Sequence, residues 1–183
     1  MTTGTQRHRA ERPSVIVLMG VAGCGKSTTG QRLSTAIGWP FRDADSFHPV
    51  ANIEKMRRGI PLTDADRWPW LDAIGGWIAE CGTMARPGIV SCSALRRVYR
   101  DRLIAGRTDV GLVYLRGDFR LIADRMSRRQ NHFMPTSLLE SQFATLEEPA
   151  PEESALVVPV ALSPKKVVER IVTRFGLDRV GNA

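Results

Sequence analysis

The stretch at residues 20–27 constrains the fold of this chain more than any other feature. It reads Gly-Val-Ala-Gly-Cys-Gly-Lys-Ser and matches the P-loop pattern G-x-x-x-x-G-K-[ST] at every fixed position. The apolar run at 14–19 predicts a buried strand before it, and residues 26–37 have the spacing of a helix, with Gly38 as a stop signal. A strand, a glycine-rich loop and a helix in this order are the context that the motif requires.

The loop suits a triphosphate, because glycines let the backbone curl around an anion with its N–H groups pointing inward. The start of the following helix adds unpaired N–H groups and the positive end of the helix dipole. Lys26 supplies a mobile charge for the β- and γ-phosphates of ATP, and the Ser27 hydroxyl is placed to ligand Mg²⁺, mostly through ATP and water. The expected phosphate-binding residues are Gly20, Val21, Ala22, Gly23, Cys24, Gly25, Lys26, Ser27 and Thr28.

Cys24 lies among these donors and has two interpretations. A helix start can lower the pKa of a thiol and make it reactive. The favoured interpretation is that Cys24 is only a small residue that fits the turn. An accidental glycine-rich turn would explain the whole motif without a nucleotide, but the strand and helix beside it argue against that.

The composition is that of one globular domain. Of the 183 residues, 43% are hydrophobic and 25% are charged. We expect a single domain over residues 14–178, a disordered basic tail at 1–13 and a short tail at 179–183. No apolar run is long enough to span a bilayer, and residues 1–12 lack the apolar segment of a secretory signal. The three cysteines lack metal-ligand spacing and indicate a reduced, cytoplasmic setting.

The net charge of +7 and the pI of about 10.0 suit an anionic partner. Nucleic acid is one class of such partner, and a small anionic substrate is the other. The sequence favours the second class, because basic residues gather in the tail and around 125–129 without an aromatic platform for single strands.

Two acidic residues, Asp43 and Asp45, follow a short second strand that begins near residue 39. Both would point to the same side if strand alternation persisted that far. Ligands of open parallel sheets bind beyond the carboxyl ends of strands, so at least one acid should face the cleft beside the P-loop. A phosphoryl acceptor needs a carboxylate near its hydroxyl, to accept the proton or to help place Mg²⁺. Alternatively, the acids only cap the next helix. The strand-end argument favours function for Asp45 and leaves Asp43 open.

Other polar residues are expected near this cleft. His48 is either a site residue or a loop-packing residue, and Ser93 follows the third strand at 88–92. Arg67 lies in the first turn of a helix that begins at a capping box of Thr63 and Asp66, and a solvated charge is its alternative role. The remaining expected elements are strands at 110–115 and 155–162 and helices at 50–59, 96–105, 119–129, from 136 or 137 to 146, and from 164 onward. Pro159 predicts an edge position for the fifth strand.

Arg125 and Arg129 lie four residues apart on one helix face. Like charges at this spacing disfavour a helix unless an anion lies between them. Phosphoryl transfer needs arginines that close over the moving group and a segment that excludes water. We therefore predict a mobile lid over roughly residues 125–137. A solvated basic helix end that matches the helix dipole is the alternative.

Several stretches beyond the P-loop resemble the P-loop type of gluconokinase, the thermoresistant gluconokinase family. They are Asp-Ala-Asp with Phe-His-Pro at 43–49, Asn-Ile-Glu-Lys-Met at 52–56, and the segments 17–21, 61–71, 92–96, 99–101 and 142–147. The P-loop alone is common to many kinases, whereas this combination is specific. The resemblance covers residues 15–175.

The resemblance implies an α/β fold like that of nucleoside monophosphate kinases: a five-stranded parallel sheet in the order 2-3-1-4-5, helices on both faces and a mobile lid. It implies phosphorylation of the 6-hydroxyl of D-gluconate by ATP, giving 6-phospho-D-gluconate and ADP. It also implies a homodimer that feeds gluconate into the pentose phosphate route. In the family, the aspartate that matches Asp45 lies beside the acceptor hydroxyl, and arginines that match Arg125 and Arg129 belong to the lid.

The resulting hypothesis places ATP and Mg²⁺ on the P-loop and gluconate in the neighbouring cleft. Lys26, Mg²⁺, Arg125 and Arg129 are expected to offset the charge of the transition state. Arg67 is expected to meet the gluconate carboxylate. The other expected acceptor contacts are Asp45, His48, Ser93 and Gln142.

Other readings fit less well. A kinase of another small acceptor such as shikimate would want a glycine-rich end to the third strand, where this chain has Cys-Ser-Ala-Leu at 92–95. A GTPase switch would want an N-K-x-D motif, which the sequence lacks. A nucleic-acid-binding ATPase is favoured only by the charge.

Overall fold

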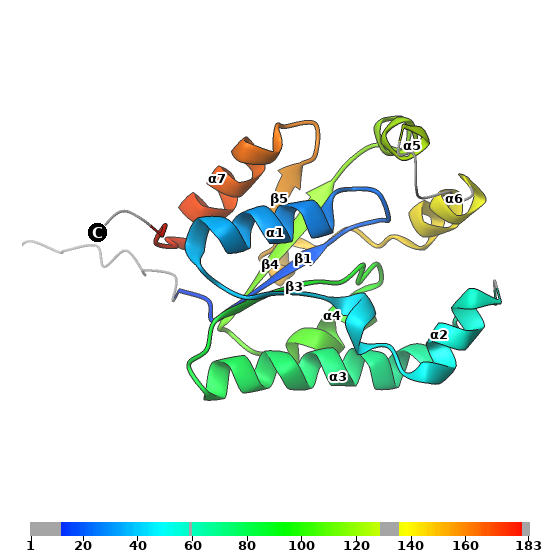
Figure 1. Ribbon diagram of the computed structural model, residues 1–183, viewed down its shortest axis with the longest axis horizontal. Helices are drawn as coiled ribbons and strands as arrows, with labels where there is room; N and C mark the ends of the chain where they lie inside the picture. The colour runs from blue at the N-terminus through cyan, green and yellow to red at the C-terminus, as the bar shows by residue number, and fades with distance from the viewer. Residues whose placement is uncertain (1–11, 59, 129–135, 181–183) are drawn as a thin grey trace, which may run out of the picture.

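A parallel sheet of five strands in the order β2-β3-β1-β4-β5 forms the centre of the structure (Figure 1). The computed structural model describes residues 12–58, 60–128 and 136–180. The strands are β1 (Val15–Met19), β2 (Phe41–Asp43), β3 (Gly88–Ser91), β4 (Val110–Arg116) and β5 (Leu156–Pro159). This order confirms the expected topology.

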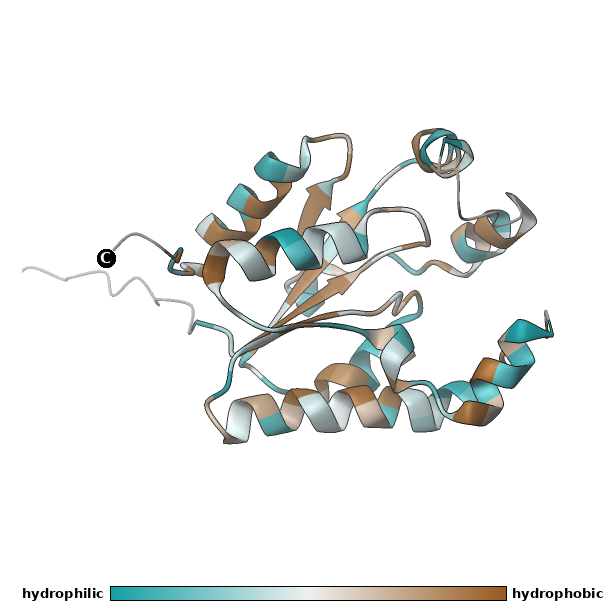
Figure 2. Ribbon diagram, in the orientation of Figure 1, coloured by the Kyte–Doolittle hydropathy of each residue, from teal (hydrophilic) through white to brown (hydrophobic). Residues whose placement is uncertain are grey.

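Helices cover both faces of the sheet (Figure 1). On one face lie α1 (Lys26–Ile37) and α7 (Pro164–Phe175), and on the other lie α3 (Asp64–Thr83) and α4 (Arg97–Ile104). Figure 2 shows the apolar colouring of the central strands between them. Strand β1 is buried throughout and its side chains alternate between two hydrophobic clusters, one on each face. Its continuous apolar sequence follows from burial on both faces.

Three helices lie beyond the carboxyl ends of the strands. They are α2 (Val50–Arg57), α5 (Phe119–Ser127) and α6 (Thr136–Thr145), and Figure 1 shows α2 below these strand ends and α5 and α6 above them. Two single 3₁₀ turns complete the description, η1 (Ala44–Phe47) and η2 (Pro151–Glu153). A ligand at the strand ends would therefore lie between α2 and the pair α5 and α6.

The predicted helix boundaries rest on caps that the structure contains. Gly38 ends α1 in the left-handed conformation with φ 74°. Thr63 and Asp66 form the capping box at the start of α3. The carboxylate of Asp118 accepts from the N–H of Leu121 at the start of α5, and Ser163 caps α7. The predicted stop at Gly38 and the predicted capping box of Thr63 and Asp66 are confirmed.

Some predicted boundaries are wrong. Strand β2 stops at Asp43, because the carboxylate of Asp43 accepts from the N–H of Asp45 (3.2 Å) and turns the chain into η1. Strand alternation therefore does not set the direction of Asp45. The fifth strand is β5 alone rather than 155–162, since the chain turns after Pro159, although its edge position is confirmed.

The chain ends are described only in part. The expected tails at 1–13 and 179–183 lie mostly outside the described residues, as does the 129–135 part of the expected lid. Arg12 forms an ion pair with Asp178, and the N–H of Val180 donates to the carbonyl of Ala36. Within the described residues, no helix combines the length and the apolar character needed to cross a membrane.

Candidate active site

The P-loop connects β1 to α1 through three glycines with positive φ. These angles are 144° at Gly20, 76° at Gly23 and 99° at Gly25. A Cβ at Gly20 would lie 2.9 Å from the carbonyl oxygen of Leu115, whereas a Cβ at Gly25 would meet nothing within 4 Å. Glycine is therefore required at Gly20 by both conformation and space, and at Gly25 by conformation alone.

We expect the Gly20→Ala substitution to lower the free energy of unfolding by about 1–3 kcal/mol, since it adds a steric clash to an unfavourable φ. Gly25→Ala is the matched control, because it imposes the conformational cost without a clash. Urea denaturation of both variants measures the difference. Equal losses for the two variants would show that the Leu115 carbonyl does not matter.

Lys26 and Ser27 occupy the first turn of α1. The Nζ of Lys26 donates to the carbonyls of Gly20 (2.8 Å) and Val21 (3.0 Å). The Oγ of Ser27 donates to Oδ2 of Asp43 (2.7 Å). Asp43 thus caps η1, which is the alternative role considered for it in the sequence analysis. Through Ser27 it also contacts the P-loop. A hydroxyl and a carboxylate are hard oxygen donors of the kind that Mg²⁺ prefers, so this pair fits the ion.

Two further predicted site residues contact the P-loop. The N–H of Ala22 donates to Oε1 of Gln142 from α6 (2.6 Å), which places Gln142 at the phosphate end of the site. The N–H of Gly20 donates to the carbonyl of Ser93 (3.3 Å) and joins the end of β3 to the loop. Contacts of Gln142 and of the Ser93 side chain with an acceptor stay predictions.

The structure brings Asp45, His48 and Arg67 together beside the end of β2. Asp45 is exposed on η1, and its carbonyl accepts from the N–H of His48 (3.4 Å). The His48 ring stacks on the indole of Trp70, with ring centroids 4.4 Å apart and planes 8° apart. Burial lowers the pKa of His48, the charge of Asp45 opposes this shift, and Arg67 adds to it. A carboxylate, an imidazole and a guanidinium therefore share one environment.

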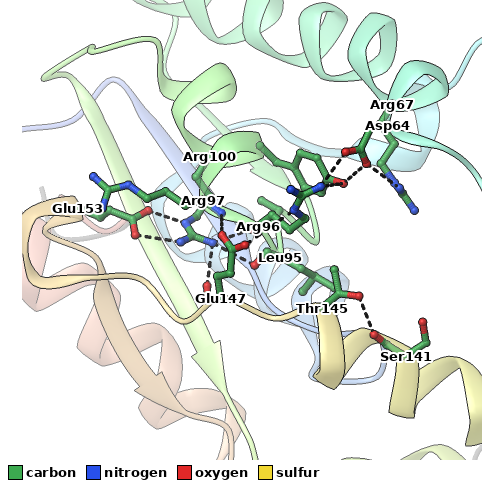
Figure 3. Close-up of polar contacts among 12 residues, drawn as sticks. Asp64, Arg67, Leu95, Arg96, Arg97, Arg100, Ser141, Thr145, Glu147 and Glu153 are labelled. Atoms are coloured by element: carbon green, nitrogen blue, oxygen red, sulfur yellow. Dashed lines mark hydrogen bonds and ion pairs between the residues drawn. The ribbon is translucent and has the colours of Figure 1, made fainter.

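Arg67 is flanked by a polar cluster that the sequence analysis missed (Figure 3). Asp64 accepts from the hydroxyl of Tyr99 (2.6 Å), from Nη1 of Arg96 (2.7 Å) and from Nη1 of Arg67 (3.4 Å). The Tyr99 hydrogen bond is the main cause that lowers the pKa of Asp64, and Arg96 adds to it. Asp64 therefore stays ionised and holds Arg67 at the start of α3.

Arg100 anchors the segment after β3. Its side chain is 1% exposed and pairs through Nε and Nη2 with Glu153. Its Nη1 donates to the carbonyls of Ala94 (3.1 Å), Leu95 (3.2 Å) and Glu147 (2.9 Å), as Figure 3 shows. One buried guanidinium thus fixes the chain between Ser93 and α4 against the chain that follows α6.

Arg125 lies on the other side of the P-loop. Its Nη2 donates to the carbonyl of Val160 (2.7 Å), and it borders a cavity of about 400 Å³. The other lining residues come from the P-loop, α1, β4, the end of α5, the segment after β5 and α7, and include Gly23, Gly25, Thr28, Thr29, Leu115, Arg128, Leu162 and Val167. Arg129 lies outside the described residues. Sequence analysis missed this cavity, because no local pattern reports where these segments meet.

All three cysteines are buried free thiols. Burial raises the pKa of Cys24, and it raises the pKa of Cys92 to about 12. Cys24 is therefore a small residue that fits the loop, and the interpretation as a reactive thiol is wrong.

Comparisons with known proteins agree on one family. The shikimate kinase family model matches residues 22–175. The chain is 42% identical over 164 residues to a gluconokinase of Gluconobacter oxydans (strain 621H), which covers 90% of this chain and 92% of that protein. It is 40% identical over 144 residues to the thermoresistant gluconokinase of Escherichia coli (strain K12), covering 79% and 82%. A solved gluconokinase from Sinorhizobium meliloti 1021 shares 44% identity and a TM-score of 0.81, covering 91% and 93%.

Proposed function

The chain is a kinase that belongs to the shikimate kinase family and, within it, to the gluconokinases, and we propose that it phosphorylates the 6-hydroxyl of D-gluconate with ATP. The observation that carries this proposal is the position of Asp45, His48 and Arg67 beside a complete P-loop. One end of the site suits a triphosphate, and the other offers a base, a neutral donor and a cation to an acidic polyol.

The phosphate end is formed by the P-loop N–H groups, Lys26, Ser27 and Asp43. Lys26 would exchange its two carbonyl contacts for phosphate oxygens, because a charge-assisted hydrogen bond is stronger than one to a neutral carbonyl. Mg²⁺, held with ATP by Ser27 and Asp43, would supply positive charge against the β- and γ-phosphates. These groups offset the negative charge that is spread over the moving phosphoryl group.

At the acceptor end, Asp45 would accept the proton of the 6-hydroxyl. A bond forms between that oxygen and the γ-phosphorus, while the bond from the γ-phosphorus to its bridging oxygen breaks. ADP leaves with the electron pair of the broken bond, and 6-phospho-D-gluconate remains. Because Asp45 is exposed on a short turn, it can approach an acceptor without rearrangement of the sheet.

The cavity beside Arg125 is the place that we propose for the nucleoside part of ATP. It adjoins Gly23, Gly25 and Thr28, so a nucleoside there would lie directly next to phosphates on the P-loop. Arg125 would then lie between nucleoside and phosphates. The role of Arg129 in closing a lid stays a prediction, as do the homodimer, the pentose phosphate route and the cytoplasmic location.

We expect Arg67→Met to raise the KM for gluconate about 10- to 100-fold, since a charge-assisted hydrogen bond to the acceptor carboxylate is lost. The dissociation constant for ATP should be unchanged. Steady-state kinetics and calorimetry give the two values. Arg170→Met, on the exposed side of α7, is the control for loss of a positive charge. An unchanged KM in Arg67→Met would remove Arg67 from the acceptor site.

The decisive experiment is ADP release by the purified chain with a panel of acceptors. The panel contains gluconate, other sugar acids, shikimate and nucleoside monophosphates. Shikimate is the second candidate, because the matching family model carries that description. Turnover with shikimate and none with gluconate would overturn the proposal.

A further inference from the structure

Asn52 is a polar residue that the proposed reaction leaves without a role, although only 3% of it is exposed. It lies on α2, one turn after His48. Its Nδ2 donates to the carbonyl of Asp66 at the start of α3 (2.8 Å), and the same nitrogen lies 3.4 Å from Nδ1 of His48. A buried amide is therefore shared between a helix start and a ring of the acceptor site.

The orientation of the Asn52 amide is determined by the Asp66 carbonyl. A carbonyl oxygen only accepts hydrogen bonds, so the Asn52 atom that faces it must be the nitrogen. The reversed amide would place two oxygens 2.8 Å apart. The nitrogen carries two hydrogens, and the second is available to His48. The neighbouring ring atom Nδ1 must then accept.

An imidazole that accepts at Nδ1 carries its hydrogen on Nε2. Trp70 fixes the plane of the ring by stacking, and its Nε1 donates to the carbonyl of Ala44 (2.8 Å), the residue between Asp43 and Asp45. In the part of the chain that the structure describes, no protein group accepts from Nε2 of His48. Trp70 therefore sets the plane of the His48 ring, and Asn52 sets its tautomer, which leaves the hydrogen on Nε2 available to a ligand.

We propose that Asn52 is a positioning residue that holds His48 with its hydrogen on Nε2, as a fixed donor to a hydroxyl of the acceptor. Only the last part of this inference, donation to a hydroxyl of the acceptor, rests on the proposed function. It gives the acceptor site one defined donor beside the Asp45 carboxylate, which only accepts when ionised. A polyol hydroxyl can accept from His48 while a neighbouring hydroxyl donates to Asp45. An acceptor without a hydroxyl at the His48 position would leave the donor unpaired and bind less well.

Nitrogen-15 NMR of the full chain tests the tautomer directly. The sequence has three histidines, so the His48→Gln variant assigns its signals. We expect the wild type to carry its hydrogen on Nε2. In Asn52→Leu, which removes the donor to Nδ1, the two tautomers should mix. A wild-type ring with its hydrogen on Nδ1 would overturn the inference, whatever substrate the chain phosphorylates.

Kinetics test the donor role. A glutamine amide nitrogen can replace Nε2, whereas an asparagine amide nitrogen replaces Nδ1, so His48→Gln should retain more kcat/KM for gluconate than His48→Asn. Asn52→Leu should lower kcat/KM roughly tenfold, the value of one unmade hydrogen bond, with ATP affinity unchanged. Lys55→Met is the control, since it removes the ion pair of α2 with Asp66 (2.6 Å) but does not contact His48. An equal loss in Lys55→Met, or equal activity of the two His48 variants, would contradict the proposal.

Discussion

Asp45→Asn is expected to lower kcat with gluconate by about 10²-fold or more, because the amide cannot accept the hydroxyl proton. The substitution preserves the shape of the side chain. The backbone N–H of residue 45 can still donate to the carboxylate of Asp43. Since Asp45 is exposed, the fold should be unaffected. Affinity for ATP should also remain, because the P-loop contacts involve Asp43 and not Asp45.

Initial-rate measurement of product formation, combined with calorimetric ATP binding, separates these effects. Glu80→Gln removes an exposed carboxylate at the far end of α3 and should leave kcat unchanged. If Asp45→Asn turned over gluconate at nearly the wild-type rate, another group would have to accept the proton.

Arg100→Met is expected to lower the free energy of unfolding by about 3–5 kcal/mol, the cost of leaving one partner of a buried ion pair alone. Arg100 and Glu153 are 1% and 7% exposed in their side chains. Three carbonyls also lose their donor. The effect should reach the active site, because Arg100 fixes the carbonyls of the two residues that follow Ser93.

Arg97→Met is the matched control on the same helix. Arg97 pairs with Glu152, but both side chains are about half exposed, so the loss should be within about 1 kcal/mol. Adding Glu153→Gln to Arg100→Met removes the unpaired carboxylate and should recover part of the stability. Urea denaturation of the four proteins provides the comparison. If Arg100→Met and Arg97→Met lost similar amounts of unfolding free energy, the burial of the Arg100 ion pair would not explain its effect.

The same ion pair predicts a dependence of stability on pH. The hydrogen bond from Arg100 lowers the pKa of Glu153 below its ordinary value of 4.5. The folded state therefore holds this carboxylate ionised where the unfolded chain would protonate it, and stability falls as the pH drops below about 4.5. Arg100→Met should lack this part of the acid sensitivity.

Local signals predicted the framework of the fold well. The P-loop, the cap at Gly38 and the capping box of Thr63 and Asp66 each depend on residues within a few positions of one another. The strand order followed from the family resemblance rather than from any local pattern. Where two local preferences competed, prediction failed: the Asp43 carboxylate turned the chain before the expected strand was complete.

Contacts between distant segments could not be predicted. Gln142 and Ala22 are 120 positions apart, and Arg100 and Glu153 are 53 apart. Each pair depends on how two elements are placed around the sheet, and periodicity contains no such information. Asp64 lies in the first turn of α3, and its contact with Tyr99 depends on the packing of α3 against α4, which no local pattern reports.

The burial of all three thiols bears on the surroundings in which the chain can work. Alkylating reagents and peroxides attack thiolates that solvent can reach, and Cys24, Cys81 and Cys92 are neither exposed nor readily ionised. The sulfur in the P-loop behaves as a space-filling atom. The cysteines therefore lose their value as an indication of a reduced compartment, because their oxidation would first require the fold to open around these side chains.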